Sequence, residues 1–410
     1  MEKLSIVYLP LDALTPYEHN TRKHSKHDIE GIKESIRQSG GFNDPIGIWG
    51  GNNLIVEGHG RLLAAKELGI KEVPCIRLDH MTEEERRKYA ILHNKTAELS
   101  EWDNEMLKFE VGDLDFGDFD FGFEFDEAEK KDVQEDNFDV DAELKRDVFS
   151  KLGDLWVLGK HRVICGDSTG EEVYTRLMDG QKANLVLTDP PYNVDVEETA
   201  GKIMNDNMGD QEFYNFLLSA YRCMHANLAD DGSIYVWHAD TEGLNFRKAF
   251  KDAGFYLSGC CIWKKNALVL GRSPYQWIHE PCLFGWKQKG KHQWYSDRKQ
   301  TTVWEYDKPR SSADHPTMKP IPLMSYPIQN STMTNGVVLD PFLGSGSTLI
   351  ACCETSRICR GIELDPKFVD VIVKRYVEWN DNKCDDVYVI RNGEKIPFEE
   401  VVPNLETEAE

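Results

Sequence analysis

The chain has 410 residues, of which 40% are hydrophobic and 29% are charged, and its formal net charge is −23 at pH 7. This length allows two domains, or one large domain with an appendage, and the composition is typical of a soluble globular protein. No stretch approaches the roughly 20 apolar residues that a membrane span needs, which excludes a transmembrane protein.

The ten cysteines and the N-terminus bear on the compartment. The cysteines are scattered through predicted strands and helices, and no CxxC motif occurs. Reduced, buried thiols explain this pattern better than disulfides or a zinc site, so we expect no metal. The first residues lack a basic region followed by an apolar one, so we expect no secretory signal and a cytoplasmic protein.

The N-terminal quarter combines short apolar runs with helical patterns. Residues 29–36 carry apolar side chains at helical spacing, and residues 54–56 predict a strand. The turn Gly58-His59-Gly60-Arg61 then leads into a predicted helix over 62–68.

The charge is distributed unevenly along the chain. Residues 101–143 contain 18 Asp/Glu and 3 Lys, a net charge of −15, whereas residues 260–320 contain 11 Lys/Arg and 5 Asp/Glu, a net charge of +6. Phosphate contacts depend on a local basic face, so the overall charge does not exclude nucleic acid. Phenylalanine and acid alternate within 105–150, which predicts an acidic linker whose phenylalanines could dock on a neighbouring domain.

From residue 151 the pattern becomes α/β. Apolar strands separated by helices indicate a mostly parallel sheet covered on both faces, whose ligands bind at the carboxyl ends of the strands. The predicted strands cover 161–165, 183–188, 233–237, 257–263, 337–340 and 358–363, and the predicted helices include 212–227, 244–253 and 367–379.

A turn rich in acceptors, Asp189-Pro190-Pro191-Tyr192, follows one predicted strand. The lone pair of an exocyclic amine is delocalised into its ring. Two acceptors on its hydrogens favour a pyramidal nitrogen and stabilise the positive charge that builds on that nitrogen when it attacks an electrophile. Asp189 supplies a carboxylate, the Pro190 carbonyl supplies a second acceptor, and both prolines stiffen the turn. Tyr192 offers a ring on which a base outside its helix can stack.

A glycine-rich turn, Pro341 to Gly346, follows a buried strand that ends in Asp340. Gly344 and Gly346 lack side chains where a ligand would lie against the backbone. The next strand ends in Glu363, at the spacing where nucleotide-binding folds place a carboxylate for ribose hydroxyls. The loop has no Gly-Lys-Ser/Thr, which disfavours ATP hydrolysis.

Basic and aromatic residues alternate between 260 and 320. Lys and Arg can contact phosphates, and rings can stack on bases. The alternative is a core of tryptophans beneath a solvated basic face. The residues that we expect to bind DNA are Lys264, Lys265, Arg272, Arg298 and Lys299.

The order of the two turns, with Asp189 before Asp340, resembles the permuted (β-class) amino-methyltransferases, which methylate the exocyclic nitrogen of a DNA base. The resemblance implies a Rossmann-like fold with a mostly parallel, seven-stranded sheet and S-adenosylmethionine as the cofactor. It implies direct displacement, without a covalent enzyme intermediate or a metal.

The same resemblance implies a role for each turn. Asp189, Pro190, Pro191 and Tyr192 form the catalytic motif. Asp340 and its loop hold the methionine end, Glu363 takes the ribose, Asp167 lies near the adenine ring, and Lys319, in His315-Pro316-Thr317-Met318-Lys319-Pro320, lies beside the methionine carboxylate. The implied cofactor residues are Asp167, Lys319, Asp340, Phe342, Gly344, Ser345, Gly346 and Glu363.

Residues 1–104 resemble the ParB/sulfiredoxin-like domain through Asn43-Asp44-Pro45-Ile46 and Val56-Glu57-Gly58-His59-Gly60-Arg61. The resemblance implies a small α+β domain in which Gly58 and Arg61 bind phosphate at a helix N-terminus. Position 59 is His, where a sulfiredoxin carries its cysteine. A structural or partner-docking domain is the alternative.

The sequence therefore predicts four regions. They are a ParB/sulfiredoxin-like domain over 1–104, an acidic linker over 105–150, a DNA methyltransferase domain over 151–395 with target recognition at about 260–315, and an acidic tail over 396–410.

The predicted function is site-specific methylation of double-stranded DNA at N6 of adenine, because Asp rather than Ser at 189 favours adenine. Cytosine N4 is the closest alternative, since the same acceptors serve either amine. A protein of another class, a ParB-like DNA-binding or nuclease protein with a degenerate methylase, is disfavoured by the intact Asp189, Tyr192 and Gly344. The host is expected to be a bacterium or a phage-infected cell, with a cognate restriction nuclease as a further candidate partner.

Overall fold

The computed structural model describes residues 4–112, 114–117, 119–123, 131–194, 197–198, 201–202, 207–269, 274–307 and 318–402. The chain divides into two compact units, Met1–Ala128 and Glu129–Glu410. The division falls inside the stretch that the sequence predicts as a linker. No helix in the described ranges is long and apolar enough to cross a membrane.

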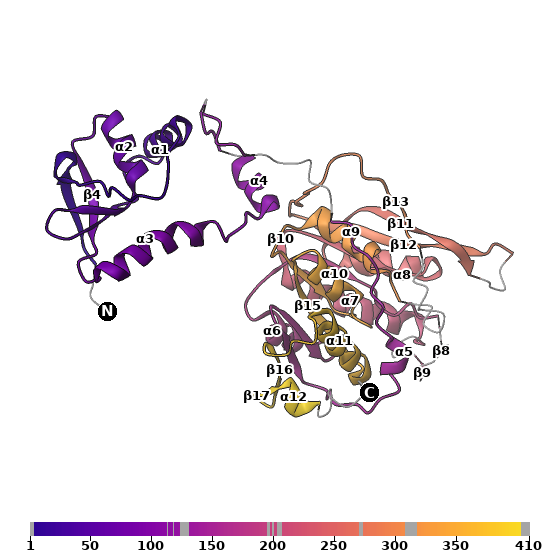
Figure 1. Cartoon of the computed structure of the whole chain (residues 1–410). Helices are drawn as coiled ribbons and strands as arrows, with labels where there is room; N and C mark the ends of the chain where they lie inside the picture. Colours follow the sequence, from indigo (N-terminus) through magenta and orange to yellow (C-terminus); the bar gives the residue numbers. More distant parts are fainter. Residues whose placement is uncertain are drawn as a thin grey trace. The chain divides into compact units, whose positions relative to one another are not determined.

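The N-terminal unit is a four-stranded sheet with helices packed against it (Figure 1). Its core consists of branched side chains such as Ile46 and Ile48 of β2, Ile55 of β3 and Leu62 of α2, all of which are buried. The strand order is β1-β4-β2-β3. The elements are β1 (Ile6–Pro10), η1 (Leu11–Ala13), α1 (Lys26–Gln38), β2 (Ile46–Trp49), β3 (Leu54–Glu57), α2 (His59–Glu67), β4 (Glu72–Arg77), α3 (Glu83–Ala97) and α4 (Asn104–Gly112).

Part of the acidic, phenylalanine-rich stretch packs on this unit. The Phe119 ring stacks on His27 of α1 with the centroids 4.9 Å apart, and the Gln38 side chain donates to the Phe116 carbonyl at 2.5 Å. Phe119 therefore packs on α1, which gives this segment an apolar contact despite its charge.

The C-terminal unit contains one sheet of eleven strands in the order β13-β11-β12-β10-β7-β14-β15-β6-β5-β16-β17. The α/β class is confirmed, but the expected count of seven strands is wrong. Five central strands, β10 to β6 in this order, are parallel. Antiparallel pairs extend the sheet on both sides, except that the outermost strand β13 pairs parallel with β11. The strands are β5 (Leu155–Leu158), β6 (His161–Cys165), β7 (Ala183–Thr188), β10 (Leu228–Trp237), β11 (Phe255–Val269), β12 (Trp277–Lys287), β13 (Val303–Glu305), β14 (Val337–Asp340), β15 (Ile358–Glu363), β16 (Val387–Arg391) and β17 (Glu394–Pro397), beside a separate β8 (Glu197–Glu198) and β9 (Gly201–Lys202) pair.

Helices cover both faces of the parallel strands because side chains alternate between the faces. In β7, Leu185 and Leu187 belong to one core cluster and Val186 to the other. The first cluster includes residues of α9, α10 and α11, and the second includes residues of α6, α7 and α8 (Figure 1). The helices are α5 (Val140–Glu143), α6 (Glu171–Met178), α7 (Asp210–Asn227), η2 (Asp240–Glu242), α8 (Gly243–Asp252), α9 (Ile321–Ser331), α10 (Ser347–Glu354), α11 (Pro366–Trp379) and α12 (Phe398–Val401).

Both ends of the C-terminal unit extend beyond the bounds expected from the sequence. Val133 and Val140 are buried in it, and the backbone amide of Ser150 donates to Asp370 of α11 at 2.9 Å. At the other end, β17 joins the sheet and Phe398 is fully buried. The acidic composition of 131–150 and of 396–402 therefore conceals a few apolar anchors.

Candidate active site

Two strand ends that are far apart in the sequence lie side by side in the sheet. The parallel neighbours β7 and β14 place Val186 opposite Leu339. Their carboxyl ends bring the acceptor-rich turn beside the glycine-rich loop. The two are joined directly, because the Thr188 hydroxyl donates to Asp340 Oδ1 at 2.8 Å. Both turns therefore lie at the same carboxyl edge of the sheet.

Within the acceptor-rich turn, Asp189 and Tyr192 are in contact. The Tyr192 hydroxyl donates to Asp189 Oδ1 at 2.5 Å, and the Tyr192 ring meets the Phe246 ring edge-on, with the centroids 6.4 Å apart. Pro190 is buried and Pro191 is half-buried. Because proline fixes φ, the short segment between the carboxylate and the ring has little freedom.

A cluster of buried charges surrounds Asp189. The Lys319 ammonium lies 2.5 Å from Asp189 Oδ2 and 3.1 Å from Glu280 Oε2. Lys265 lies 2.5 Å from the other oxygen of Glu280, Oε1. The side chains of Lys319 and Lys265 are only 4% and 7% exposed. We call Asp189, Tyr192, Lys265, Glu280 and Lys319 the charge cluster.

The charge cluster sets the protonation of its members. Burial raises the pKa of Asp189, and the nearby Lys319 ammonium opposes the rise. Burial alone would raise the pKa of Glu280, but the ammonium groups of Lys319 and Lys265 lower it to about 2. Burial also raises the pKa of Tyr192 well above its usual range, and the two carboxylates add to the rise. Tyr192 therefore stays a neutral hydrogen-bond donor.

Asp340 organises the glycine-rich loop. It accepts from Thr188, from the backbone amide of Phe342 at 3.1 Å and from the Thr348 hydroxyl of α10 at 2.6 Å. Burial raises the pKa of Asp340 to about 6, although the bonds from Thr348 and Thr188 oppose the rise. Gly346, with φ of 89°, begins α10 in a left-handed conformation that favours glycine. The Phe342 ring packs edge-on to Phe216 of α7, with the centroids 5.9 Å apart.

Glu363 and Asp167 lie at the ends of the next two strands. The Glu363 carboxylate accepts from the backbone amides of Gly344, at 2.8 Å, and of Asp365, at 2.9 Å. The Glu363 carbonyl accepts from the amide of Gly166 at 2.9 Å, and the following residue, Asp167, is exposed. Asp340, Glu363 and Asp167 thus follow three adjacent parallel strands.

The acidic segment that precedes the sheet supports both halves of the site. Asp136 pairs with both Nε and Nη2 of Arg375, at 2.5 and 3.0 Å, and Arg375 Nη1 donates to the Ser345 carbonyl at 3.0 Å. Glu135 accepts from the amide of Ile321, at the start of α9, at 3.0 Å. Asp136 thus acts through Arg375 on the glycine-rich loop, and Glu135 holds the helix that follows Lys319.

Lys319 and Lys265 lie elsewhere than the sequence predicts. We expect Lys319 beside the methionine carboxylate, yet its ammonium is held between Asp189 and Glu280. We expect Lys265 on DNA, but it is buried and paired with Glu280, so it faces no phosphate here. Glu280 is not among the site residues predicted from the sequence. The one available signal is that Glu280 is the first acid in the basic stretch from residue 260.

The remaining predicted DNA contacts are divided between a long hairpin, which carries Lys264, and the loop between β12 and β13, which carries Arg298 and Lys299. Lys264 is half exposed and lies 2.8 Å from Glu305 of β13, and Arg298 and Lys299 are exposed. The hairpin of β11 and β12 projects beyond the rest of the sheet (Figure 1), and near its tip Tyr275 is 88% exposed. Arg272 lies outside the described residues.

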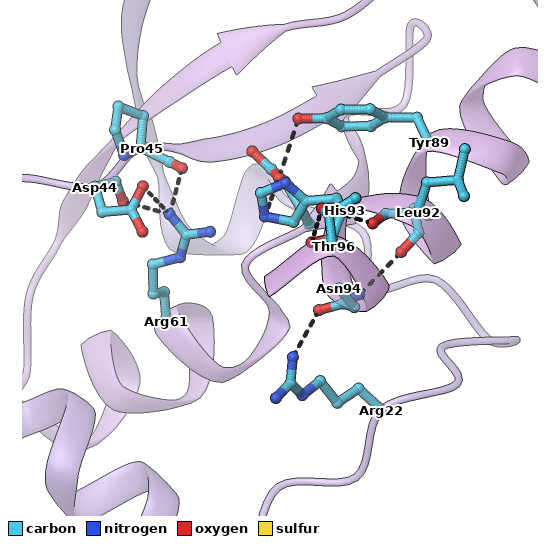
Figure 2. A network of polar contacts seen from close by, with 11 residues as sticks. Arg22, Asp44, Pro45, Arg61, Tyr89, Leu92, His93, Asn94 and Thr96 are labelled. Atoms are coloured by element: carbon cyan, nitrogen blue, oxygen red, sulfur yellow. Dashed lines mark hydrogen bonds and ion pairs between the residues drawn. The ribbon is translucent and has the colours of Figure 1, made fainter. Parts of the chain in front are cut away.

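The N-terminal unit has a pocket of about 640 Å³ beside Gly58, the residue before α2. Its wall includes Arg61, whose Nη1 donates to the carbonyls of Asp44 and Pro45, and Arg22, which donates to Asn94 at 3.0 Å (Figure 2). Four histidines also line it, but the described residues contain no group of three His, Cys, Asp or Glu placed to hold a metal ion.

Three comparisons relate the chain to known proteins. Residues 183–374 match the N6_N4_Mtase family model, DNA methylase. The ParB-like nuclease domain-containing protein YnaK of Escherichia coli (strain K12) is 42% identical over 87 residues, which cover 21% of this chain and 98% of YnaK. Type II methyltransferase M2.MboI of Moraxella bovis is 25% identical over 220 residues, which cover 48% of this chain and 81% of that protein. The match to the crystal structure of the M1.HpyAVI–SAM complex covers 52% of this chain and 98% of that chain. Its sequence identity is 22% and its TM-score is 0.41.

The matches agree with the two units. Nearly all of YnaK aligns at 42% identity. The DNA methylase model spans both the turn at Asp189 and the loop after Asp340. The chain therefore belongs to the ParB-like domain family through its N-terminal region, and joined to that domain is a DNA methyltransferase of the N6_N4 family, which acts on N6 of adenine or N4 of cytosine.

Proposed function

We propose that this chain transfers the methyl group of S-adenosylmethionine to N6 of adenine in double-stranded DNA, in the cytoplasm of a bacterium or a phage-infected cell. The observation that carries the proposal is the bond between Thr188 and Asp340, which fixes the two turns side by side. One turn offers acceptors for an amine, and the other offers open backbone beside carboxylates. A cognate restriction nuclease is a further proposed partner.

The residues of the glycine-rich loop fit the cofactor. A Cβ at Gly344 would meet nothing within 4 Å, so the backbone there is open. The buried Ser347 hydroxyl, at the start of α10, has no hydrogen-bond partner among the described residues. In the proposal Asp340 and the loop hold the methionine end, Glu363 takes the ribose hydroxyls and Asp167 lies near the adenine ring. Phe342, Ser345 and Gly346 complete the proposed set, whereas the Lys319 ammonium is paired with Asp189 and Glu280.

The acceptor-rich turn performs the other half of the reaction. S-adenosylmethionine supplies a methyl carbon on a sulfonium, and its C–S bond breaks as the amine nitrogen forms the new N–C bond. Asp189 and the Pro190 carbonyl accept the amine hydrogens and stabilise the positive charge on nitrogen. Asp189 is the nearest base for the proton that nitrogen then loses, and burial raises its pKa. Tyr192 supplies the surface on which the flipped base stacks.

Label transfer tests the substrate class. Incubation with methyl-labelled S-adenosylmethionine and unmethylated genomic DNA is expected to place label in the DNA, and RNA or a protein mixture at equal mass should stay unlabelled. Asp at position 189 favours adenine as the base within that DNA. Label found in RNA or protein instead of DNA would contradict the proposal.

Cofactor affinity is expected to fall as the pH falls through 7. Burial raises the pKa of Glu363 to about 7, although backbone amides oppose the rise. Only the ionised carboxylate offers all its acceptor sites to ribose hydroxyls. A group with a pKa of about 7 is about one-tenth ionised at pH 6, so the Kd should rise about tenfold between pH 8 and pH 6. Calorimetric titration of the full chain with S-adenosylmethionine at each pH measures this Kd.

A glutamine at this position provides the control. E363Q should bind the cofactor more weakly at pH 8 and lose this pH dependence. The folding stability of the unliganded chain depends on pH in the opposite direction. A raised carboxyl pKa contributes stability that is lost as the pH rises through about 7. A wild-type Kd that does not change with pH would contradict the role of Glu363.

For the DNA we propose contacts by Lys264, Arg272, Arg298 and Lys299. Support comes from the exposure of Arg298 and Lys299 and from the exposed Tyr275 at the hairpin tip. Exposed basic groups suit phosphates, and an exposed ring suits a distorted base step.

For the N-terminal pocket we propose phosphate binding by Gly58 and Arg61. The left-handed Gly58, with φ of 91°, turns the chain into α2, whose free amides favour an anion. R61Q in the full chain is expected to weaken pyrophosphate binding at least about tenfold. Calorimetry measures it, with R37Q, an exposed arginine of α1, as the matched control. Equal affinity of R61Q and wild type would rule out this role.

A further inference from the structure

Asp189 is electrically neutralised in the structure. Its Oδ2 lies 2.5 Å from the Lys319 ammonium, and its Oδ1 accepts from Tyr192. In the proposed reaction the carboxylate stabilises positive charge on the amine nitrogen, and a cation in contact with it cancels that effect. Lys319 must therefore give up its contact with Asp189 when the amine arrives.

Glu280 provides the second place where Lys319 can go. Its Oε2 lies 3.1 Å from the Lys319 ammonium while that ammonium still contacts Asp189. Its own position is fixed, because its Oε1 pairs with Lys265 at 2.5 Å and its strand, β12, lies beside β11. The Glu280 carboxylate stays ionised beside the two lysines, so it remains an anion throughout.

Two aromatic rings flank the Lys319 ammonium, so its movement from Asp189 to Glu280 is short. The ammonium lies 5.3 Å from the Tyr192 ring centroid and 5.6 Å from that of Trp237. Both rings attract a cation at such distances. Lys319 can thus leave Asp189 while it stays between two aromatic faces and Glu280, without returning to water.

We propose that Glu280 is a positioning residue that draws Lys319 away from Asp189 when the target amine arrives. The inference rests on the proposed function and names a residue that the sequence analysis misses. Without Glu280, the Lys319 ammonium would lose one of its two carboxylate partners and stay on Asp189, where the amine would have to compete with it. The proposed cofactor residues belong to the other turn, and the base stacks on the Tyr192 ring, whose hydroxyl rather than its face contacts Glu280 at 3.3 Å. The affinities for the base and the cofactor should therefore change little with this exchange.

The test is a double-mutant cycle on the full chain. E280Q keeps the size and polarity of the side chain but removes the charge. Its single-turnover rate at saturating cofactor and DNA should fall about 100-fold, while the Kd values for both stay within about twofold. E280D, which keeps the charge, should recover part of the rate even if E280Q folds poorly. The control is D230N, which removes an exposed acid that pairs with Lys287 of β12, the strand that carries Glu280. The single-turnover rate of D230N should match that of the wild type.

The second arm separates positioning from simple structural support. Replacing Lys319 with Met in the E280Q background removes the cation that blocks Asp189, so E280Q/K319M should be faster than E280Q. A structural role for Glu280 would make the double variant slower still. An E280Q rate within about threefold of wild type, or a double variant no faster than E280Q, overturns the inference. An inactive wild type would instead overturn the proposed function.

Discussion

Replacing Asp189 with Asn is expected to lower the rate of methyl transfer about 10³-fold. The amide keeps the shape of the side chain but presents one acceptor and no negative charge to the developing positive nitrogen. It also leaves the Lys319 ammonium, now 2.5 Å from Asp189 Oδ2, without one of its two anionic partners. Single-turnover measurements at saturating cofactor and DNA give this rate directly.

The matched control for this change is D179N. Asp179 is 70% exposed, pairs with Arg162 and has φ of 49°, a conformation that asparagine adopts readily. The D179N variant should transfer methyl groups at the wild-type rate. D189N should keep the cofactor affinity within a few-fold, because Asp189 belongs to the other turn. An active D189N would remove Asp189 from the mechanism.

Replacing Asp340 with Ala is expected to weaken cofactor binding about 100-fold and to lower the melting temperature. Asp340 is almost completely buried and holds Thr188, Thr348 and the amide of Phe342. Its removal leaves three donors unpaired and releases both the start of the loop and its link to β7. Calorimetry with S-adenosylmethionine and thermal unfolding measure the two effects.

An exposed acid in the loop before β16 serves as the comparison. D385A removes a carboxylate from the surface of the same unit. It should leave the cofactor affinity and the melting temperature unchanged. D340A with wild-type affinity would show that the loop does not need this carboxylate to bind the cofactor.

The parallel strands were the most predictable part of the fold. Residues 161–165, 183–188, 337–340 and 358–363 are strands with those bounds in the structure. Each is an apolar run that ends at a polar residue or a turn, and burial on both faces leaves few other interpretations. Because parallel strands share one carboxyl edge, the sequence also placed the turns after Thr188 and Asp340 together. The bond between these two residues bears this out.

The charge cluster could not be predicted in the same way. Lys319, Glu280 and Asp189 come from three distant parts of the chain, and no local pattern reports such pairings. Lys265 could have been placed better. Side chains alternate along a strand, so Lys265 of β11 faces the same side as the buried Trp263, and only Lys264 faces the other. The prediction that both Lys264 and Lys265 contact DNA did not take that alternation into account.

Averaged composition also concealed the start and the end of the methyltransferase unit. Residues 131–150 are acidic as a group, but Val133 is buried and Asp136 pairs with Arg375. A few anchors in an acidic segment do not change its mean charge or hydropathy. Their partners, such as Arg375, lie more than 200 residues away, so only the folded chain brings them together.

The central claim is that this chain methylates N6 of adenine in DNA with Asp189 as the acceptor of the amine. Unmethylated genomic DNA would be incubated with the protein and S-adenosylmethionine, digested to nucleosides and analysed by mass spectrometry, beside D189N. The expected result is N6-methyladenine that disappears in D189N. N4-methylcytosine would contradict the choice of base. The absence of any methylated nucleoside, with the cofactor bound, would contradict methyl transfer to DNA.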